Sequence, residues 1–154
     1  MDISKKLQNL YEELIEEGCS CNNFYIYGIN KNVPDDVVCL NSVGQKWEIY
    51  YTERNKKSEI FYSTNDLDDA INYYRTFIKD IVHWHLVCFT RSIEIKNKYK
   101  KILEINKIKI VENEIPAYNY SGDHVYRLFI TNKDILKAKN LFKDIPYYDD
   151  KLKK

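Results

Sequence analysis

Two short motifs carry the residue types that bind metal ions. Cys19-x-Cys21 offers two thiols and His83-x-His85 offers two imidazoles, and thiolate sulfur and imidazole nitrogen are common zinc ligands. The spacing argues against a zinc site, because zinc-binding cysteines are usually separated by two or more residues and residues two apart on a helix point to different faces. His85 falls on an apolar stripe, where a hydrogen-bonded core histidine is the simpler interpretation. We therefore expect no metal and no cofactor.

The remaining candidates for catalysis do not form a recognisable arrangement. His124 stands beside Asp123, but no serine or cysteine elbow motif accompanies it, so a nucleophilic triad has no support. The chain has four glycines and each stands alone, whereas phosphate-binding loops bring backbone N–H groups close to the ligand with grouped glycines. The sequence therefore predicts a protein that is not an enzyme.

The composition is that of a globular chain that folds unaided. The 154 residues are 44% hydrophobic and 31% charged, which suits one domain or two small ones and argues against disorder. No apolar run approaches the ~20 residues of a membrane span, and Met1–Lys6 leads into a polar helical pattern instead of a signal peptide. The four cysteines are most simply free thiols in a reducing compartment. We therefore expect a cytoplasmic protein with no membrane partner.

The net charge of +1 hides two halves of opposite sign. Residues 12–74 contain 12 acidic and 5 basic side chains, and residues 75–154 contain 17 basic and 10 acidic side chains. Either the solvent-exposed charges are distributed unevenly by chance, or the acidic half offers a face to a basic partner. Seven of the fourteen tyrosines lie between Tyr25 and Tyr74. Tyrosine is enriched in binding hot spots, although an AT-rich genome is a plainer source of the excess.

A pattern that ends a strand and begins a helix occurs twice. Phe61–Tyr74 and Phe129–Phe142 share apolar, hydroxyl and acidic residues at an offset of 68 positions. In both, a hydroxyl three residues before an aspartate predicts a helix N-cap, at Ser63 and Thr131, and such a cap is worth roughly 1 kcal/mol. Either the chain contains a duplicated α-β-β-α unit, or two capped helices merely resemble each other.

Apolar spacing in the N-terminal half predicts a helix, antiparallel strands and a second helix. The first helix occupies residues 3–17 and ends at Gly18. Strands at 47–51 and 59–62 flank a polar turn and predict a hairpin. From Asp66 to Phe89, apolar residues recur at helical spacing, which predicts one long helix that is either continuous or broken near His83.

The C-terminal half is predicted to repeat this order of helix, strands and helix. A helix around residues 95–105 precedes Lys107–Val111, whose alternation indicates a half-buried strand. A strand at Val125–Ile130 and a helix at Asn132–Lys143 follow. The fold class is therefore predicted as α+β, with antiparallel sheets and flanking helices. The expected sub-domains are residues 1–90 and 91–154, packed as one globular unit.

One region resembles small bacterial immunity proteins, which are encoded beside polymorphic toxins. Their pattern is roughly Trp-x-Val/Ile-Tyr-Tyr-x-Glu-Arg-Gly-x-Lys, then Phe-x-Ser/Thr and an acidic helix with Ala and Tyr. The match lies in Lys46–Lys57, Phe61-x-Ser63, Ala70 and Tyr73-Tyr74, with no counterpart in the C-terminal half. Asn55 replaces the glycine, and asparagine also tolerates a left-handed turn conformation.

The resemblance implies a non-enzymatic protein that binds a cognate toxin domain in the cytosol and blocks it. Tight inhibition needs a preformed patch of about 800 Å² on each partner. A nuclease toxin has a basic substrate groove, which the acidic half would complement. We place the binding surface on the hairpin and the acidic helix, at Trp47, Tyr50, Tyr51, Glu53, Arg54, Asp66, Asp68 and Asp69. Trp47 and one of the two tyrosines are alternatively core residues.

The alternative is a nucleic-acid-binding or regulatory protein that uses the basic half. Its phosphate contacts would be Lys100, Lys101, Lys107 and Lys109, and its affinity would fall steeply with salt. The low overall charge makes nucleic acid the less favoured partner.

Overall fold

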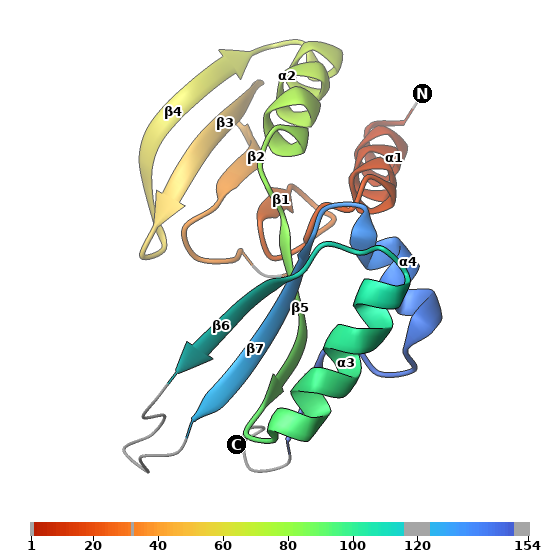
Figure 1. Cartoon of the computed structure of the whole chain (residues 1–154). Helices are drawn as coiled ribbons and strands as arrows, with labels where there is room; N and C mark the ends of the chain where they lie inside the picture. Colours follow the sequence, from red (N-terminus) through yellow and green to blue (C-terminus); the bar gives the residue numbers. More distant parts are fainter. Residues whose placement is uncertain (1, 32, 116–123, 150–154) are drawn as a thin grey trace. The chain divides into compact units, whose positions relative to one another are not determined.

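The chain has an α+β fold built from two compact units, Met1–His83 and Trp84–Lys154 (Figure 1). The computed structural model describes residues 2–31, 33–115 and 124–149. Each unit contains one four-stranded sheet and two of the helices, so the predicted fold class is confirmed. The division falls after His83 and not after residue 90, because the strand that begins at Trp84 pairs within the second unit.

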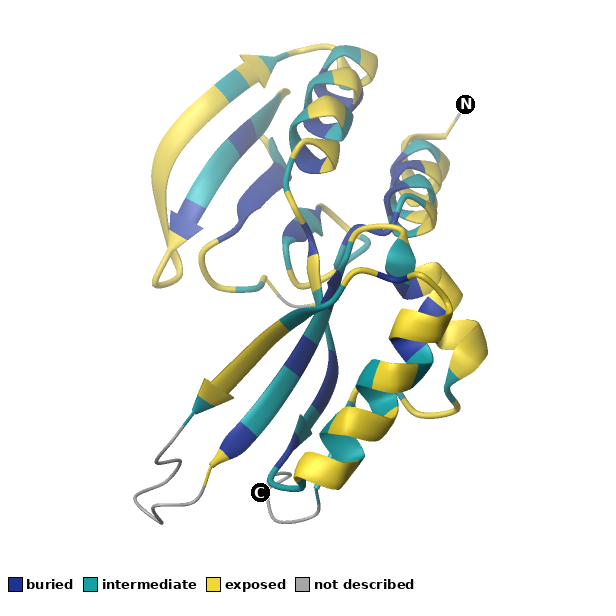
Figure 2. Cartoon of the chain, in the orientation of Figure 1, coloured by how far each residue is buried: buried dark blue, intermediate teal, exposed yellow. Residues whose placement is uncertain are grey.

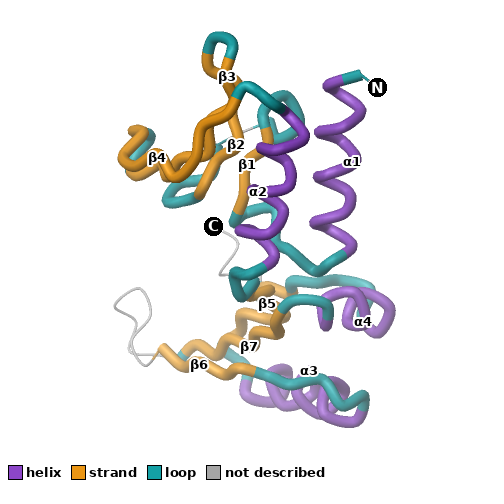
Figure 3. The backbone as a smooth tube through the Cα atoms, turned by 90° about the horizontal axis from the view of Figure 1, so that it is seen from above, coloured by secondary structure: helices purple, strands orange, loops and turns teal. Residues whose placement is uncertain are grey.

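The first unit is a sheet with two helices on one face. The strand order is β1-β2-β3-β4, with β1 parallel to β2 and the other neighbours antiparallel, so the sheet is mixed and not purely antiparallel. In Figure 3, α1 and α2 lie side by side. The elements are α1 (Ile3–Glu16), β1 (Phe24–Ile26), β2 (Val38–Val43), β3 (Lys46–Glu53), β4 (Lys56–Thr64) and α2 (Leu67–Lys79).

Helix α1 and the β3–β4 hairpin follow the sequence pattern. Leu7, Leu10 and Leu14 recur on one face of α1 and are buried, and Gly18 ends the helix with a φ of 83°, a conformation that glycine adopts without steric cost. The hairpin turns through Arg54 and Asn55, whose φ values of 52° and 65° are those of a type I′ turn. Asparagine therefore takes the place of the expected glycine.

A buried tyrosine joins α2 to the sheet. Tyr74 is fully buried. Its hydroxyl accepts from the Tyr25 N–H (3.0 Å) and lies 3.0 Å from the Tyr25 carbonyl and 2.5 Å from the Val38 carbonyl. Because Tyr25 is in β1 and Val38 in β2, this one side chain fixes the helix to both strands.

The predicted long helix from residue 66 to residue 89 is wrong. Helix α2 ends at Lys79, and Trp84–Thr90 is a strand. The His83 ring, which is buried, lies with Nε2 2.8 Å from the Ile78 carbonyl, and its Nδ1 accepts from the Ser20 N–H at 3.1 Å. The His83 ring thus hydrogen-bonds to a carbonyl in the last turn of α2 and to the backbone of the loop after α1. These two bonds fix the chain where it leaves the helix, and a strand follows.

The second unit is also a sheet with two helices on one face. The strand order is β6-β7-β5-β8, antiparallel except for the parallel pair β5 and β8. The elements are β5 (Trp84–Thr90), α3 (Ile93–Ile105), β6 (Val111–Ile115), β7 (Val125–Thr131), α4 (Asp134–Leu141) and β8 (Tyr147–Tyr148). The buried side chains that form its core are Val87, Cys88, Leu103, Ile108, Leu128, Ile130, Ile135 and Ala138.

Two further predictions in the second half require correction. The strand expected at Lys107–Val111 begins at Val111 instead, because the Ile108 N–H still bonds to the Leu103 carbonyl (3.0 Å) at the end of α3. The predicted N-caps are also misplaced: Asp66, not Ser63, caps α2, and α4 has no side-chain cap. The unit orders α-β-β-β-β-α and β-α-β-β-α-β differ, and the duplicated unit is not confirmed.

No described helix combines the length and the apolar character that a membrane crossing requires.

Candidate protein-binding surface

The predicted site residues of the hairpin lie on both faces of the sheet. Trp47 and Tyr51 are on the face covered by the helices and pack against the core. The Trp47 ring meets Tyr27 edge to face at 6.2 Å. Burial and the nearby carboxylate of Asp36 raise the pKa of Tyr51. The main role of these two aromatic residues is therefore to pack against the core.

Tyr50 points to the opposite face, away from the helices. Its hydroxyl accepts from Asn41 Nδ2 at 2.8 Å. Lys57 Nζ lies 5.1 Å from the centroid of its ring and 2.7 Å from Glu48 Oε1. This arrangement is a polar cluster on the outer face of β2, β3 and β4.

Glu53 and Arg54 stand at the tip of the hairpin. Both are exposed, and the Arg54 N–H donates to Asp35 Oδ1 at 2.8 Å. Along a strand that rises about 3.3 Å per residue, the tip is about 20 Å from Trp47 at the start of β3. The tip therefore belongs to a separate part of the surface.

The three predicted aspartates gather at the start of α2. Asp66 caps the helix by accepting from the Asp68 N–H at 3.0 Å. Asp68 forms an ion pair with Lys6 of α1 at 2.9 Å. Asp69 accepts from the Tyr62 hydroxyl at 2.6 Å. The eight predicted residues thus fall into four places, and the start of α2 is the one that holds three of them.

Neighbouring residues that were not predicted extend this place into a surface. Strand β4 is the edge of its sheet and is largely exposed (Figure 2). Ile60 is 50% exposed and Phe61 37%. Ile60 pairs with Tyr50 and shares its outward face, whereas Phe61 and Tyr62 contact α2. We call the following set the β4–α2 surface: Phe61, Tyr62, Asp66, Asp69, Tyr73 and Phe77. The sequence signal for this surface was the run Ile60-Phe61-Tyr62. A strand with one solvent-facing side normally alternates apolar and polar residues, and this run contains no polar residue.

Ring contacts hold the β4–α2 surface together. Tyr62 stacks on Tyr73 with centroids 4.4 Å apart and planes 3° from parallel. Phe61 meets Phe77 at 5.5 Å. Since Asp69, Tyr73 and Phe77 are spaced by four residues, they form one face of α2 beside β4. The surface is therefore preformed before any partner binds.

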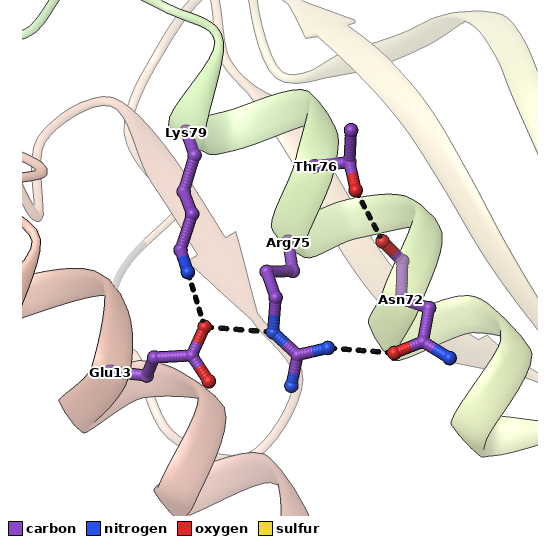
Figure 4. A network of polar contacts seen from close by, with 5 residues as sticks. All are labelled: Glu13, Asn72, Arg75, Thr76 and Lys79. Atoms are coloured by element: carbon purple, nitrogen blue, oxygen red, sulfur yellow. Dashed lines mark hydrogen bonds and ion pairs between the residues drawn. The ribbon is translucent and has the colours of Figure 1, made fainter.

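The opposite side of α2 is joined to α1 by a charged network (Figure 4). Glu13 Oε2 lies 2.7 Å from both Arg75 Nε and Lys79 Nζ, and Arg75 also donates to Asn72 Oδ1 at 2.6 Å. Burial pushes the pKa of Glu13 upward, but the hydrogen bonds and charges of Lys79 and Arg75 outweigh it, and the pKa lies below its usual value. A groove of about 340 Å³ runs along this network. In this network two cations of α2 share one carboxylate of α1, and the shared carboxylate joins the two helices.

The histidine and cysteine pairs do not converge on a metal site. Within the described ranges, no group of three or more His, Cys, Asp or Glu side chains is arranged to hold an ion. Cys19 is buried, which raises the pKa of its thiol to about 11, whereas Cys21 is exposed. His85 pairs with Ile130 in the second sheet, outside the unit that contains His83.

The lysines of the alternative prediction are only partly available to a phosphate backbone. Lys100 Nζ lies 2.9 Å from Glu112 Oε2, and Lys96 Nζ lies 3.4 Å from Oε1 of the same carboxylate. The hydrogen bond from Lys100 lowers the pKa of Glu112 against the effect of burial. Lys101, Lys107 and Lys109 are exposed.

A scan against protein-family models and searches of curated proteins and of solved structures each find no match to this chain. Its function must be inferred from its own residues.

Proposed function

We propose that this chain is a non-enzymatic immunity protein that binds a cognate toxin domain in the bacterial cytoplasm and blocks it. The observation that carries the proposal is the β4–α2 surface. There, the exposed Phe61 and the half-buried Tyr62 of an edge strand lie beside aromatic and acidic side chains of a helix. This combination is the anatomy of a protein interface, in which a few aromatic anchors are surrounded by a polar rim.

The edge strand adds a second mode of recognition. An edge strand presents backbone N–H and C=O groups that a strand of another protein can pair with. Ile60 and Phe61 stand at the centre of β4, where they would contact alternate side chains of such a strand. Hydrogen bonding by the backbone and burial of these two residues would then act together.

Charge selects the class of partner. The first unit contains 14 acidic and 9 basic residues, and Asp66 and Asp69 lie at the β4–α2 surface. A negative field of this kind attracts a basic domain and raises its association rate. A toxin nuclease, whose groove must hold phosphates, is a partner of the required charge.

The resemblance to immunity proteins supports the proposal in the same part of the chain. Of the residues that carry it, Ile49, Ala70 and Tyr74 are fully buried in the core of the first unit. The shared pattern therefore specifies how the hairpin and α2 pack, and the residues that face solvent beside it are free to differ with the partner.

The proposal is tested by expressing the chain together with the product of the neighbouring gene and measuring the affinity of the purified pair by calorimetry. Asp66→Asn with Asp69→Asn removes two charges yet keeps an N-cap and an acceptor for Tyr62. Phe61→Ala removes an anchor. We expect each variant to weaken binding about tenfold or more.

The matched control is Glu12→Gln with Glu16→Gln, which removes two exposed charges from α1. It should leave the affinity within about twofold, as expected of charges remote from an interface. Absence of any complex, or a complex that responds to the control as strongly as to the β4–α2 variants, contradicts the proposal.

A further inference from the structure

The second unit carries a row of aromatic side chains on the face of its sheet that the helices do not cover. Trp84 meets Phe129 at 5.5 Å, and Phe89 meets Tyr148 at 6.0 Å. Arg127 stands between the two pairs, with its guanidinium carbon 5.4 Å from the Phe129 centroid and 6.0 Å from the Phe89 centroid. We call these five residues the aromatic row. None of the four rings belongs to the buried core of the unit, although Phe142 and Tyr147 on the other side do pack against that core.

The row follows the two central strands. Trp84 and Phe89 are in β5, and Arg127 and Phe129 are in β7, its antiparallel neighbour. The five residue steps from Trp84 to Phe89 correspond to about 17 Å of strand. Trp84 is 51% exposed, and the other four residues of the row are half-buried. The row is therefore a track of ring faces long enough for several stacked groups.

The charge on this track is positive and is held in place. Asn113 of β6 accepts from Arg127 Nε at 2.9 Å and from Nη2 at 2.8 Å, and these bonds do not use Nη1. Within the described part of the chain, no carboxylate forms an ion pair with Arg127. Three acidic residues of neighbouring strands and their ends have other partners: Glu112 pairs with Lys96 and Lys100, Glu114 pairs with His124, and the Asp149 carboxylate accepts from the Thr90 hydroxyl and the Arg91 N–H.

From this arrangement we infer that the second unit binds single-stranded nucleic acid along the aromatic row. Single strands are bound by stacking their bases on aromatic side chains and arginine planes of an open surface. A cation fixed between the rings can contact the phosphates that link the bases. The unit contains 15 basic and 9 acidic residues, so its field favours a polyanion even though the whole chain is nearly neutral.

The row predicts which nucleic acids bind. Bases in a duplex are stacked on one another and cannot lie on protein rings, so a single strand should be preferred over a duplex of equal length. Stacking and phosphate contact do not use the 2′-hydroxyl, so RNA and DNA strands should bind within a few-fold of each other. This inference is independent of the toxin partner, which is assigned to the first unit.

Fluorescence anisotropy of the full chain with labelled single strands of about 12 nucleotides, of RNA and of DNA, tests the inference. Trp84→Ala and Phe129→Ala should each weaken binding about tenfold or more, whereas Trp84→Phe, which keeps a ring, should retain most of it. Ile105→Ala changes an exposed residue at the end of α3 and is the matched control. Raising the salt from about 50 mM to about 200 mM should weaken binding further.

Three results would overturn the inference. The first is no binding of either strand at the lower salt concentration. The second is equal affinity of the wild type and the folded Trp84→Ala and Phe129→Ala variants, which would assign any binding to scattered lysines. The third is a dimer in light scattering that dissociates in Trp84→Ala, which would make the row a contact between two copies of the chain. Circular dichroism of each variant establishes that it is folded.

Discussion

Replacing Tyr74 by phenylalanine isolates one hydroxyl that joins α2 to two strands. The ring of phenylalanine keeps the packing volume, but the hydroxyl is lost. The Tyr25 N–H then has no hydroxyl oxygen to donate to, and the Tyr25 and Val38 carbonyls no longer have the hydroxyl proton as a hydrogen-bond donor. A net hydrogen bond is worth about 1 kcal/mol, and a buried donor left unsatisfied costs about 1–3 kcal/mol. We therefore expect Tyr74→Phe to lower the free energy of unfolding by about 2–3 kcal/mol.

The adjacent residue supplies the control for this experiment. The Tyr73 hydroxyl makes no hydrogen bond to any described group, although its ring stacks on Tyr62, so Tyr73→Phe should cost less than about 0.5 kcal/mol. In a Trp84→Phe background, Trp47 is the one remaining tryptophan, and its fluorescence during urea unfolding reports on the first unit. For a unit of this size, the Tyr74→Phe loss corresponds to a fall in Tm of about 10–20 °C.

Alkaline pH provides an internal check on the same residue. Burial raises the pKa of Tyr74 well above its ordinary value of 10.0, despite the opposing hydrogen bond to the Tyr25 backbone. The hydroxyl therefore contributes its full stability below pH 10, and this contribution is lost as the pH rises from there toward the folded-state pKa. The difference between wild type and Tyr74→Phe should shrink above pH 10. Equal stabilities of Tyr73→Phe and Tyr74→Phe at neutral pH would refute the reasoning.

Two further predictions concern titratable groups of this chain. Lys79 and Arg75 hold the pKa of Glu13 below its usual value of 4.5 against the effect of burial, so Glu13 stabilises the fold above that pH and the contribution is lost as the pH falls below it. Glu13→Gln should cost less than about 1 kcal/mol at pH 7, because the network is partly exposed, and progressively less as the pH falls below 4.5; a cost that does not shrink in acid would contradict this. Of the four thiols, only Cys21 is exposed, and it alone should react rapidly with a disulfide reagent before urea is added. Burial raises the pKa of the others to about 11, at Cys19, Cys39 and Cys88, and a second fast thiol in native protein would show that one of these sites opens.

Local chemistry was sufficient to predict the elements whose ends are marked by special residues. Gly18 ends α1, and Arg54-Asn55 turns the β3–β4 hairpin, because each position requires a backbone conformation that few residues adopt. The acidic start of α2 was also predictable from the dipole preference for Asp68 and Asp69. The cap itself was not, since Ser63, Thr64 and Asp66 all offer an oxygen and only the tertiary path of the chain decides among them.

The long helix was wrong because a buried strand and a buried helix look alike over a short apolar run. Trp84–Thr90 is apolar on both sides: Val87 and Cys88 face the helices and Trp84 and Phe89 face away. Such a run matches helical spacing as readily as strand spacing. The helix and the strand are separated at His83, whose ring hydrogen-bonds to the Ile78 carbonyl. This contact exists only in the folded chain, so the sequence does not reveal it.

The same ambiguity concealed the aromatic row. Read as a helix, Trp84 and Phe89 fall on different faces of a buried segment and attract no functional interpretation. Read as a strand, with the bulge between Leu86 and Cys88, they return to one face and meet Phe129 and Arg127 from β7. The pairing register creates the row, because Arg127 lies opposite Phe89 and not opposite a residue of the core face. A surface made by register between strands about 40 residues apart in sequence is invisible to periodicity within either strand. The basic excess of this half therefore pointed to the lysines on α3 and just after it, and not to Arg127 on the sheet.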